Sequence, residues 1–266
     1  MFKTSSALAS IVSLLLLPSS LVKGEELKPV SKWAVGYEPA MCTLSRQFGT
    51  TEGPVLLAFR PYIGSEEEQI AVLLPPSANR GIKRGRGRIV LQPSGQTFAT
   101  LYAAGPLPKG DGRRAINIDV DQASVRTKLA TATAMVVEAA GQSHVFQLSG
   151  TGGALTALKA CEDDLLRGWG ADPAAMIGQD EAGSLGTWFS RDNYPKAALA
   201  RRATGRVRVI VDVGPDGHTM ACRVLETSGD RDLDAGTCAI LMKRGDYPRA
   251  SVPKRFAIHA IRWTIE

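Results

Sequence analysis

Four cysteines have the most specific chemistry in this chain: Cys42, Cys161, Cys222 and Cys238. An even number of cysteines in an oxidising compartment predicts two disulfides, and three pairings are possible. The domain division described below favours Cys42–Cys161 and Cys222–Cys238, because each bond then closes within one domain. Metal binding is the competing use, but the chain has no CxxC pair and no partner histidine. We therefore predict no metal site and no cofactor.

The histidines and carboxylates form no recognisable catalytic motif. His144, His218 and His259 are far apart in the sequence, and none is paired with a cysteine or serine in a known arrangement. The chain lacks the Gly-x-Ser-x-Gly elbow of a serine hydrolase. The acidic runs at residues 66–68 and 162–164 would need a facing partner for paired-carboxylate catalysis. We therefore expect no enzyme and assign no catalytic residue. An unrecognised envelope hydrolase is an alternative, because distant residues can converge in a fold.

Residues 80–88 form the most basic stretch, in which arginine and lysine are interleaved with glycine. Such a stretch can bind nucleic acid or anionic membrane surfaces. Outside the cytoplasm we interpret it as a solvated hairpin tip between two strands, and we predict no nucleic-acid partner. The net charge of +6 over 266 residues is too small to indicate such a partner by itself.

The N-terminus has the pattern of a secretory signal peptide. Lys3 supplies a positive charge, residues 7–17 are apolar apart from serine, and a Pro-Ser-Ser break follows at residues 18–20. We predict a signal peptide at residues 1–24, Glu25 as the mature start, and a periplasmic protein without stable membrane insertion. The alternative is an uncleaved inner-membrane anchor facing the periplasm. The apolar run is shorter than the roughly 20 residues that a spanning helix needs.

The expected first domain, residues 25–170, is rich in short strand-like runs separated by Gly, Pro, Ser or Asn. These runs lie at residues 32–37, 42–48, 54–62, 69–74, 87–92, 97–103 and 115–120. Many short strands at such spacing predict a β-rich sandwich or partly open barrel. Helices are expected at residues 121–129 and 153–169. Cys161 lies on or beside the apolar stripe of the second helix, so a disulfide could join this helix to the strand with Cys42.

Residues 171–186 are small, polar and glycine-bearing, which is typical of an interdomain linker. Extended, such a segment reaches on the order of 50 Å. We therefore expect a connection that allows the two domains to reorient. The second domain then covers residues 187–266.

The second domain combines helix and strand signals in an α+β unit. Tyr194-Pro195 starts a short helix, since proline suits a first helical turn. Residues 205–213 alternate valine with polar residues, and this period of two predicts a half-buried strand with Arg208 and Asp212 opposite the valines. The remaining elements are expected as a turn at residues 214–217, a strand at residues 218–227, a helix at residues 231–243 and a closing strand at residues 256–265.

Several motifs in the second domain resemble the C-terminal domain of TonB proteins. They are, in order, Tyr194-Pro195-x-x-Ala198, Gly205-x-Val207-x-Val209, Asp216-Gly217, Val224-x-x-x-Ser228-Gly229, Leu233-Asp234 and Tyr247-Pro248-x-Ala250. Each motif is ordinary, but their order and spacing together are specific. The resemblance implies a three-stranded antiparallel sheet with two helices. The first domain resembles no family that we recognise.

The TonB resemblance also implies a partner. The family domain grips a short N-terminal segment of outer-membrane transporters by strand addition, in which backbone bonds give affinity and alternate side chains give selectivity. The corresponding edge here is the closing strand, with the candidate partner-binding residues Phe256, Ile258, His259, Ile261, Trp263 and Ile265. We therefore predict a non-catalytic protein that binds a transporter segment or another envelope protein and is linked to TonB-dependent transport.

Two departures from the family argue against the usual TonB energy transducer. The resemblance implies an uncleaved anchor helix that contains a histidine, followed by a long Pro-rich spacer. Here residues 1–24 contain no histidine, and a globular domain stands in place of the spacer. A membrane-anchored energy transducer is therefore the alternative to a detached binding protein.

Overall fold

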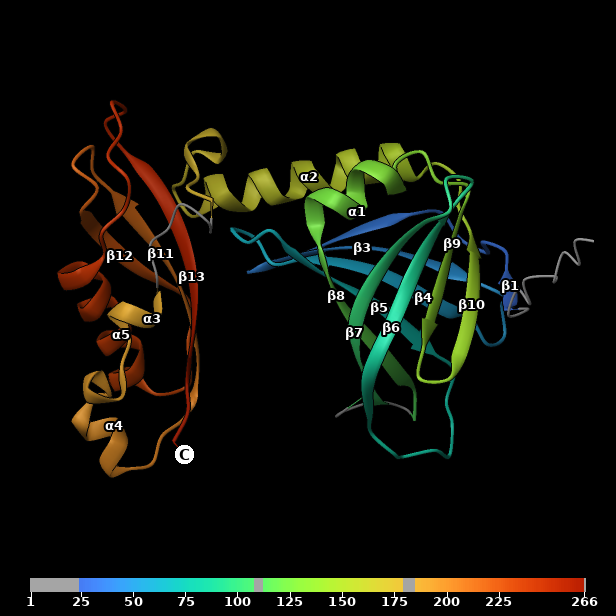
Figure 1. Ribbon diagram of the computed structural model, residues 1–266, viewed down its shortest axis with the longest axis horizontal. Coiled ribbons are helices and arrows are strands. Elements are labelled where there is room, and N and C mark those ends of the chain that lie inside the picture. The colour runs from blue at the N-terminus through green and yellow to red at the C-terminus, as the bar shows by residue number, and fades with distance from the viewer. Residues whose placement is uncertain (1–23, 108–111, 179–184, 266) are drawn as a thin grey trace, which may run out of the picture.

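The structure, a computed structural model, describes residues 24–107, 112–178 and 185–265. Apart from Gly24, the predicted signal peptide lies outside these residues. The described residues form a ten-stranded sheet in the N-terminal part and a three-stranded sheet in the C-terminal part. Figure 1 shows the two sheets at opposite ends of the molecule, with helix α2 (Thr151–Gly168) running from the larger sheet towards the smaller one. The predicted combination of a β-rich part and a small α+β part is confirmed.

The ten-stranded sheet curls into a half-barrel. Its strands, in spatial order, are β1 (Glu25–Leu27), β10 (Gln142–Gln147), β9 (Ala134–Ala139), β6 (Lys83–Gln92), β7 (Gln96–Pro106), β8 (Arg114–Asp121), β5 (Glu67–Leu74), β4 (Val55–Pro61), β3 (Met41–Phe48) and β2 (Ala34–Glu38). β1 and β10 pair in parallel, whereas β10 and β9 pair antiparallel. Phe48 of β3 and Phe146 of β10 are fully buried, and their rings lie 5.1 Å apart. The two ends of the sheet therefore approach each other, as in a partly open barrel.

Two parts of this sheet differ from the sequence prediction. The hairpin of β9 and β10 lies at residues 134–147, where we expected no strand. Residues 83–88 belong to strand β6, so their interpretation as a hairpin tip is wrong. Arginine and glycine alternate there with the period of a strand, and the glycines make room for Tyr102 of β7. A Cβ on Gly85 would come within 3.2 Å of the Tyr102 hydroxyl.

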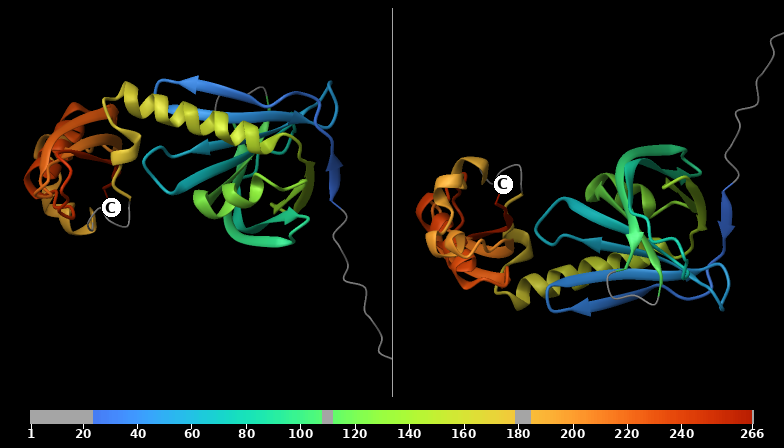
Figure 2. Two further views of the ribbon diagram at one scale, coloured as in Figure 1. Left: turned by 90° about the horizontal axis from the view of Figure 1, so that it is seen from above. Right: turned by 90° about the horizontal axis from the view of Figure 1, so that it is seen from below.

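Helix α2 lies along the β2–β3 side of the half-barrel (Figure 2). The disulfide Cys42–Cys161 joins it to β3, with the two Cα atoms 6.1 Å apart. The bond spans 119 residues, for which the chain-entropy model gives about 4–5 kcal/mol of stabilisation. The shorter helix α1 (Gln122–Leu129) begins where the Asp121 side chain accepts a hydrogen bond from Ser124 N over 2.8 Å.

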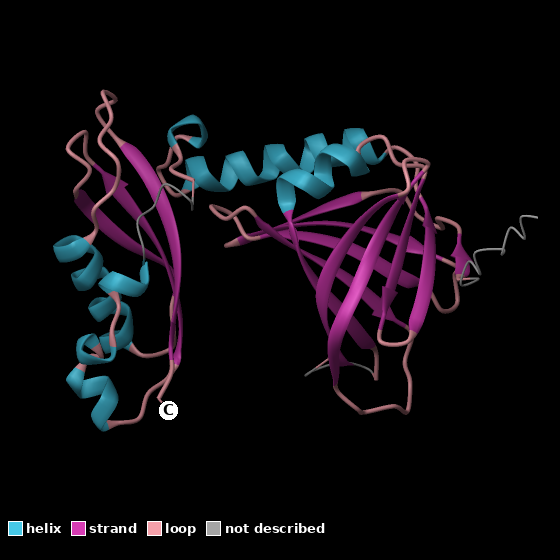
Figure 3. Cartoon of the chain, viewed as in Figure 1, coloured by secondary structure: helices cyan, strands magenta, loops and turns pink. Residues whose placement is uncertain are grey.

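The C-terminal sheet has the strand order β12 (Thr219–Glu226), β11 (Gly205–Val213) and β13 (Arg255–Trp263). The helical elements around it are η1 (Pro173–Ala175), α3 (Leu185–Trp188), η2 (Arg191–Asn193), α4 (Lys196–Ala200) and α5 (Arg231–Arg244). Figure 3 shows the α-helices on the side of the sheet that faces away from the first domain. The β11 valines pack there in one core with Leu233 and Leu241 of α5. The second predicted disulfide, Cys222–Cys238, joins β12 to α5.

Replacing Cys222 and Cys238 together with serine should destabilise the C-terminal domain. The bond spans 16 residues, for which the chain-entropy model gives about 3 kcal/mol. For a domain of this size, such a loss lowers the Tm by about 10–20 °C. Thermal unfolding followed by circular dichroism measures this shift. The Cys42→Ser/Cys161→Ser variant is the comparison and should lower the Tm of the first domain instead. An unchanged Tm in C222S/C238S would contradict the prediction.

Candidate functional site at the outer edge of β13

Strand β13 forms one edge of the three-stranded sheet. Its nine residues pair with β11 in an unbroken antiparallel register from Gly205↔Trp263 to Val213↔Arg255. The other edge strand, β12, pairs with β11 through two register shifts. An edge strand presents unpaired backbone N–H and C=O groups, to which another strand can bind. The regular geometry of β13 makes it the better template of the two.

One contact shows which backbone groups of β13 face outwards. Ile177 N donates a hydrogen bond to Phe256 O over 2.7 Å from outside the sheet, and Met176 forms a parallel bridge with Phe256. Backbone groups of alternate residues point the same way in an antiparallel strand. The N–H and C=O groups of Ile258, Ala260 and Arg262 therefore face outwards too. Within the described part of the chain, no backbone group from outside the sheet bonds to these three residues. We call them the β13 edge.

The side chains predicted to contact a partner lie mostly in the interior. Ile261 and Trp263 face the helices and belong to the C-terminal core, and His259 lies beside Trp188 and Tyr247 of the same core. Phe256 and Ile258 face the first domain and belong to its core. Ile265 follows the end of β13 and is partly buried. The side chains therefore hold the strand in place, and its outward backbone N–H and C=O groups are what a partner can bind.

Trp263 anchors the end of β13 under the helices. Its indole Nε1 donates a hydrogen bond to Thr237 Oγ1 of α5 over 2.9 Å. The rings of Tyr194 and Phe189 contact it edge-on, with centroids 5.0 Å and 5.8 Å away. Tyr194, the first residue of the TonB-like motifs, therefore positions this strand.

His259 is buried in the same core, with 4% of its surface exposed. Its Nε2 shares a hydrogen bond with Tyr247 Oη over 2.7 Å, and the Trp188 ring lies edge-on to it. Burial lowers the pKa of His259 to about 4, because desolvation disfavours the imidazolium form. Burial likewise raises the pKa of Tyr247. Both side chains are therefore neutral near pH 7.

We expect the C-terminal domain to lose stability as the pH falls below about 6.5. In the unfolded chain a histidine titrates near 6.5, whereas His259 titrates at about 4 in the fold. Between these values the unfolded state binds more protons, so acid favours unfolding. The difference corresponds to about 3 kcal/mol, lost progressively through this window. Urea unfolding at about pH 7 and about pH 4.5 measures it. The His259→Gln variant should show a smaller loss, and an equal loss would contradict the assignment.

The first domain packs against part of the sheet face opposite the helices. Ile210, Phe256 and Ile258 join the hydrophobic core of the first domain. The turn between β4 and β5 packs closely, since a Cβ on Gly64 would come within 2.5 Å of Ile258 Cβ. The helices therefore pack on one face of the C-terminal sheet, and the first domain packs on part of the other, where Ala260 and Arg262 remain exposed.

From Val207 to Val213, strand β11 is buried on both faces, so the prediction of a half-buried strand is wrong for this part. Arg208 and Asp212 are only 7% and 8% exposed. Arg208 donates to Ala40 O over 2.8 Å and lies 5.2 Å above the Trp169 ring. Asp212 accepts hydrogen bonds from Arg223 and Lys254. These partners allow the charges to be buried, although desolvation still lowers the pKa of Arg208.

The described part of the predicted linker is docked against the protein. Residues 173–175 form the 3-10 helix η1, which follows an Asp172 cap, and Ile177 is buried beside β13. Arg223 of β12 also donates to Trp169 O at the end of α2 over 2.9 Å. The expected freedom to reorient does not hold for residues 171–178. Residues 179–184 lie outside the described part of the chain.

A cavity of about 430 Å³ lies between the first domain and the β13 edge. Its lining includes Tyr62 and Gly64 from the β4–β5 turn, Arg206 from β11, and Ala260. The Arg206 guanidinium lies 5.7 Å above the Tyr62 ring. A side chain on a strand added to β13 could enter this space, so the first domain would form one wall of the site.

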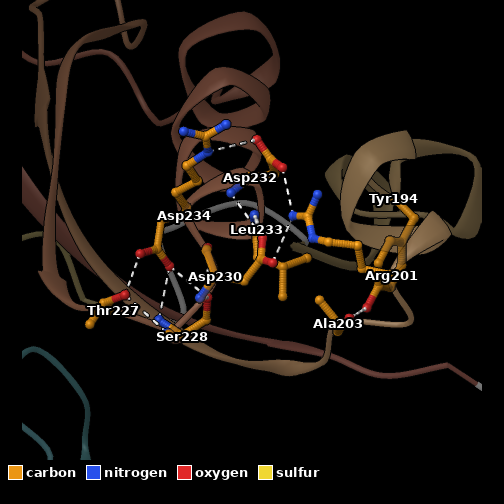
Figure 4. Close-up of polar contacts among 11 residues, drawn as sticks. Tyr194, Arg201, Ala203, Thr227, Ser228, Asp230, Asp232, Leu233 and Asp234 are labelled. Atoms are coloured by element: carbon orange, nitrogen blue, oxygen red, sulfur yellow. Dashed lines mark hydrogen bonds and ion pairs between the residues drawn. The ribbon is translucent and has the colours of Figure 1, made fainter.

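Other motif residues shape the turn regions that hold the sheet and α5 together (Figure 4). Arg201 pairs with Asp230 and Asp232 at the start of α5, over 2.8 Å and 2.6 Å. Asp234 accepts a hydrogen bond from Ser228 N over 2.8 Å. The Tyr194 hydroxyl donates to Ala203 O.

The motif glycines and proline mark close approaches. Gly217 has a φ of +87°, and a Cβ there would come within 2.1 Å of Tyr247 O. A Cβ on Gly205 would come within 2.7 Å of Ser228 O. Pro195 packs against Gly236 of α5, where a Cβ would come within 2.5 Å of the proline ring. Close packing at these positions therefore explains why glycine and proline occur at this spacing in the motifs.

The comparison with family models agrees with this geometry. Residues 190–265 match the family described as Gram-negative bacterial TonB protein C-terminal. This is a TonB-type domain. The resemblance seen in the motifs is therefore confirmed for this part of the chain, and it links the domain to envelope proteins that serve transport. Comparisons with curated proteins and with solved structures give no match.

Outside the TonB-type domain, the two acidic runs meet at one arginine. Glu68 of β5 accepts two hydrogen bonds from Arg126 of α1, over 2.8 Å and 3.1 Å. Glu162 of α2 forms an ion pair with the same arginine at 2.8 Å. Burial raises the pKa of both carboxyls. The sequence carried no signal for this cluster, because its three members are far apart in the chain and meet only in the fold.

The histidine of the first domain lies apart from this cluster. His144 is 6% exposed, beside Phe146, and lines a cavity of about 580 Å³ together with Lys83 and Arg114. Across the described ranges, no group of three or more His, Cys, Asp or Glu residues could hold a metal ion. None of the helices in those ranges is long and apolar enough to cross a membrane.

Proposed function

We propose that the protein is a non-catalytic binding protein of the Gram-negative periplasm. Its TonB-type domain binds an extended segment of an outer-membrane transporter, or of another envelope protein, by strand addition to the β13 edge. The observation that carries this proposal is the regular edge strand, on which the backbone groups of Ile258, Ala260 and Arg262 face outwards. An extended segment can satisfy these groups with its own N–H and C=O groups.

The surroundings of the edge limit what can bind. Ile177 already bonds to Phe256 O, so the site starts beyond Phe256. On the side of the first domain, alternate side chains of the partner would meet the cavity lined by Tyr62, Arg206 and Ala260. We propose that this wall selects among partners, because the backbone bonds of strand addition are indifferent to sequence and selectivity comes from pockets for alternate side chains.

Titration with synthetic transporter peptides tests the function. Peptides from the N-terminal segments of outer-membrane transporters should bind the purified protein saturably in isothermal titration calorimetry. Scrambled peptides of the same composition are the control and should bind more weakly. If none of the peptides binds, or if scrambled peptides bind equally well, the link to transporters is wrong.

Sequencing of the N-terminus of the exported protein tests the periplasmic location. A mature chain that starts at Glu25 supports a binding protein released into the periplasm. A chain that retains residues 1–24 in the membrane fraction would instead support an anchored energy transducer.

A further inference from the structure

The convex face of β6 and β7 carries the basic stretch that the proposed function leaves unused. Arg84, Arg86 and Arg88 alternate along β6 with Gly85 and Gly87, so the three arginines share one face of the strand. Tyr102 occupies the opposite, concave face over the glycines. The arginines are therefore directed outwards by the pleat of a regular strand.

Two large aliphatic side chains accompany the arginines on this face. Leu101 of β7 is paired with Arg86 and is 69% exposed. Ile82 precedes β6, is 65% exposed and borders Gly105 of β7, where a Cβ would lie 3.4 Å from it. Figure 2 shows β6 and β7 on the side of the half-barrel away from α2, which leaves this face uncovered. We call Ile82, Arg84, Arg86, Arg88 and Leu101 the basic face.

The positive charge of the basic face is only partly balanced. Arg88 pairs with Glu138 of β9, with Nη2 and Oε1 3.1 Å apart. Asp119 of β8 is paired with Leu101 of β7, and its carboxylate accepts a hydrogen bond from the Tyr62 hydroxyl. Arg84 and Arg86 are exposed and form no ion pair with any residue that the structure describes. These two arginines are therefore free to meet an anionic partner.

We propose that the basic face binds the anionic phospholipid headgroups of a membrane surface. Arginine attracts the phosphates, and exposed aliphatic side chains between the charges enter the boundary with the acyl chains. A single-stranded nucleic acid would instead use aromatic side chains on which bases stack, and the basic face presents aliphatic ones. This contact would place the protein against a membrane through residues other than those of the β13 edge.

Vesicle co-sedimentation of the purified protein tests the proposal. Binding is expected to phosphatidylcholine vesicles that contain phosphatidylglycerol, and not to vesicles of phosphatidylcholine alone. In Arg84→Gln/Arg86→Gln the affinity should fall about 25-fold, or about five-fold per arginine, at low salt. Ile82→Ser/Leu101→Ser should also weaken binding, which a purely ionic contact would not show.

The matched control is Arg167→Gln/Arg231→Gln, which removes the same charge from exposed positions elsewhere. It should bind as the unchanged protein does, and it shares the same N-terminus, so any contribution of residues 1–24 cancels. Equal binding of the control and of R84Q/R86Q would overturn the proposal. So would binding of a single-stranded oligonucleotide, lost in R84Q/R86Q, by a protein that ignores the anionic vesicles. Neither outcome depends on the transporter peptides, so the two proposals fail separately.

Discussion

The Ala260→Pro variant should bind transporter peptides at least about tenfold more weakly while its C-terminal domain stays folded. Ala260 is exposed, and its N–H faces away from β11, so proline there removes no bond of the sheet. The variant loses one donor to the added strand, worth about 1 kcal/mol. Its ring also occupies the space where that strand would lie, which adds to the loss. Isothermal titration calorimetry measures the change in Kd.

The choice of residue decides whether this experiment is informative. Proline at Ile261 would remove an N–H that faces Val207 of β11 and would destabilise the sheet itself. Ala260→Ser is the matched control, because it keeps the N–H group and nearly the same volume. It should bind as the unchanged protein does. An unaltered Kd in A260P, with an intact circular dichroism spectrum, would show that the peptide binds somewhere else.

The Arg126→Leu variant should lose about 3–5 kcal/mol of the free energy of unfolding of the first domain. Arg126 lies between two buried carboxylates, and the Glu68 side chain has no exposed surface. Leucine would remove the charge partner of Glu68 and leave Glu162 with only the more distant Lys159, and unpaired buried charges are costly. Guanidinium chloride unfolding at pH 7, with the disulfides intact, measures the loss.

The dependence on pH separates this electrostatic cause from a packing defect. The pKa values of Glu68 and Glu162 are already raised in the fold, and removal of Arg126 raises them further. As the pH falls, the two carboxyls take up protons in the folded state, so the loss in R126L should shrink. Adding Glu68→Gln and Glu162→Gln should restore most of the stability at pH 7.

A control on the same helix completes this test. Lys128 is exposed on α1. Lys128→Leu should change the free energy of unfolding by less than about 0.5 kcal/mol. A loss in R126L that is equally large at low pH, or that persists in the triple variant, would contradict the electrostatic explanation.

Much of the TonB-type domain could be predicted because its signals are local. The valine alternation of residues 205–213 coincides with β11, and the motif Ser228-Gly229 precedes α5, which Asp230 caps. These features depend on neighbours within a few residues. The cysteine pairing could also be predicted from the sequence, once the chain had been divided into two domains. The hairpin at residues 134–147 was missed, although Val136 and Val137 favour a strand and Ala140-Gly141 form a two-residue turn in which both residues have a positive φ.

The sequence by itself determined the three strands and the helices α4 and α5 of the C-terminal domain, its family and the strand on which a partner is proposed to bind. Only the tertiary structure decided that Ile258, Ala260 and Arg262 face outwards, since this depends on the pairing register and on the contact of Ile177 with Phe256. The tertiary structure likewise decided that Arg208 is buried against Trp169, and that Glu68 and Glu162 share Arg126. Such contacts join residues far apart in the chain. They arise from the way the two domains and the helices pack, for which no stretch of sequence carries a local signal.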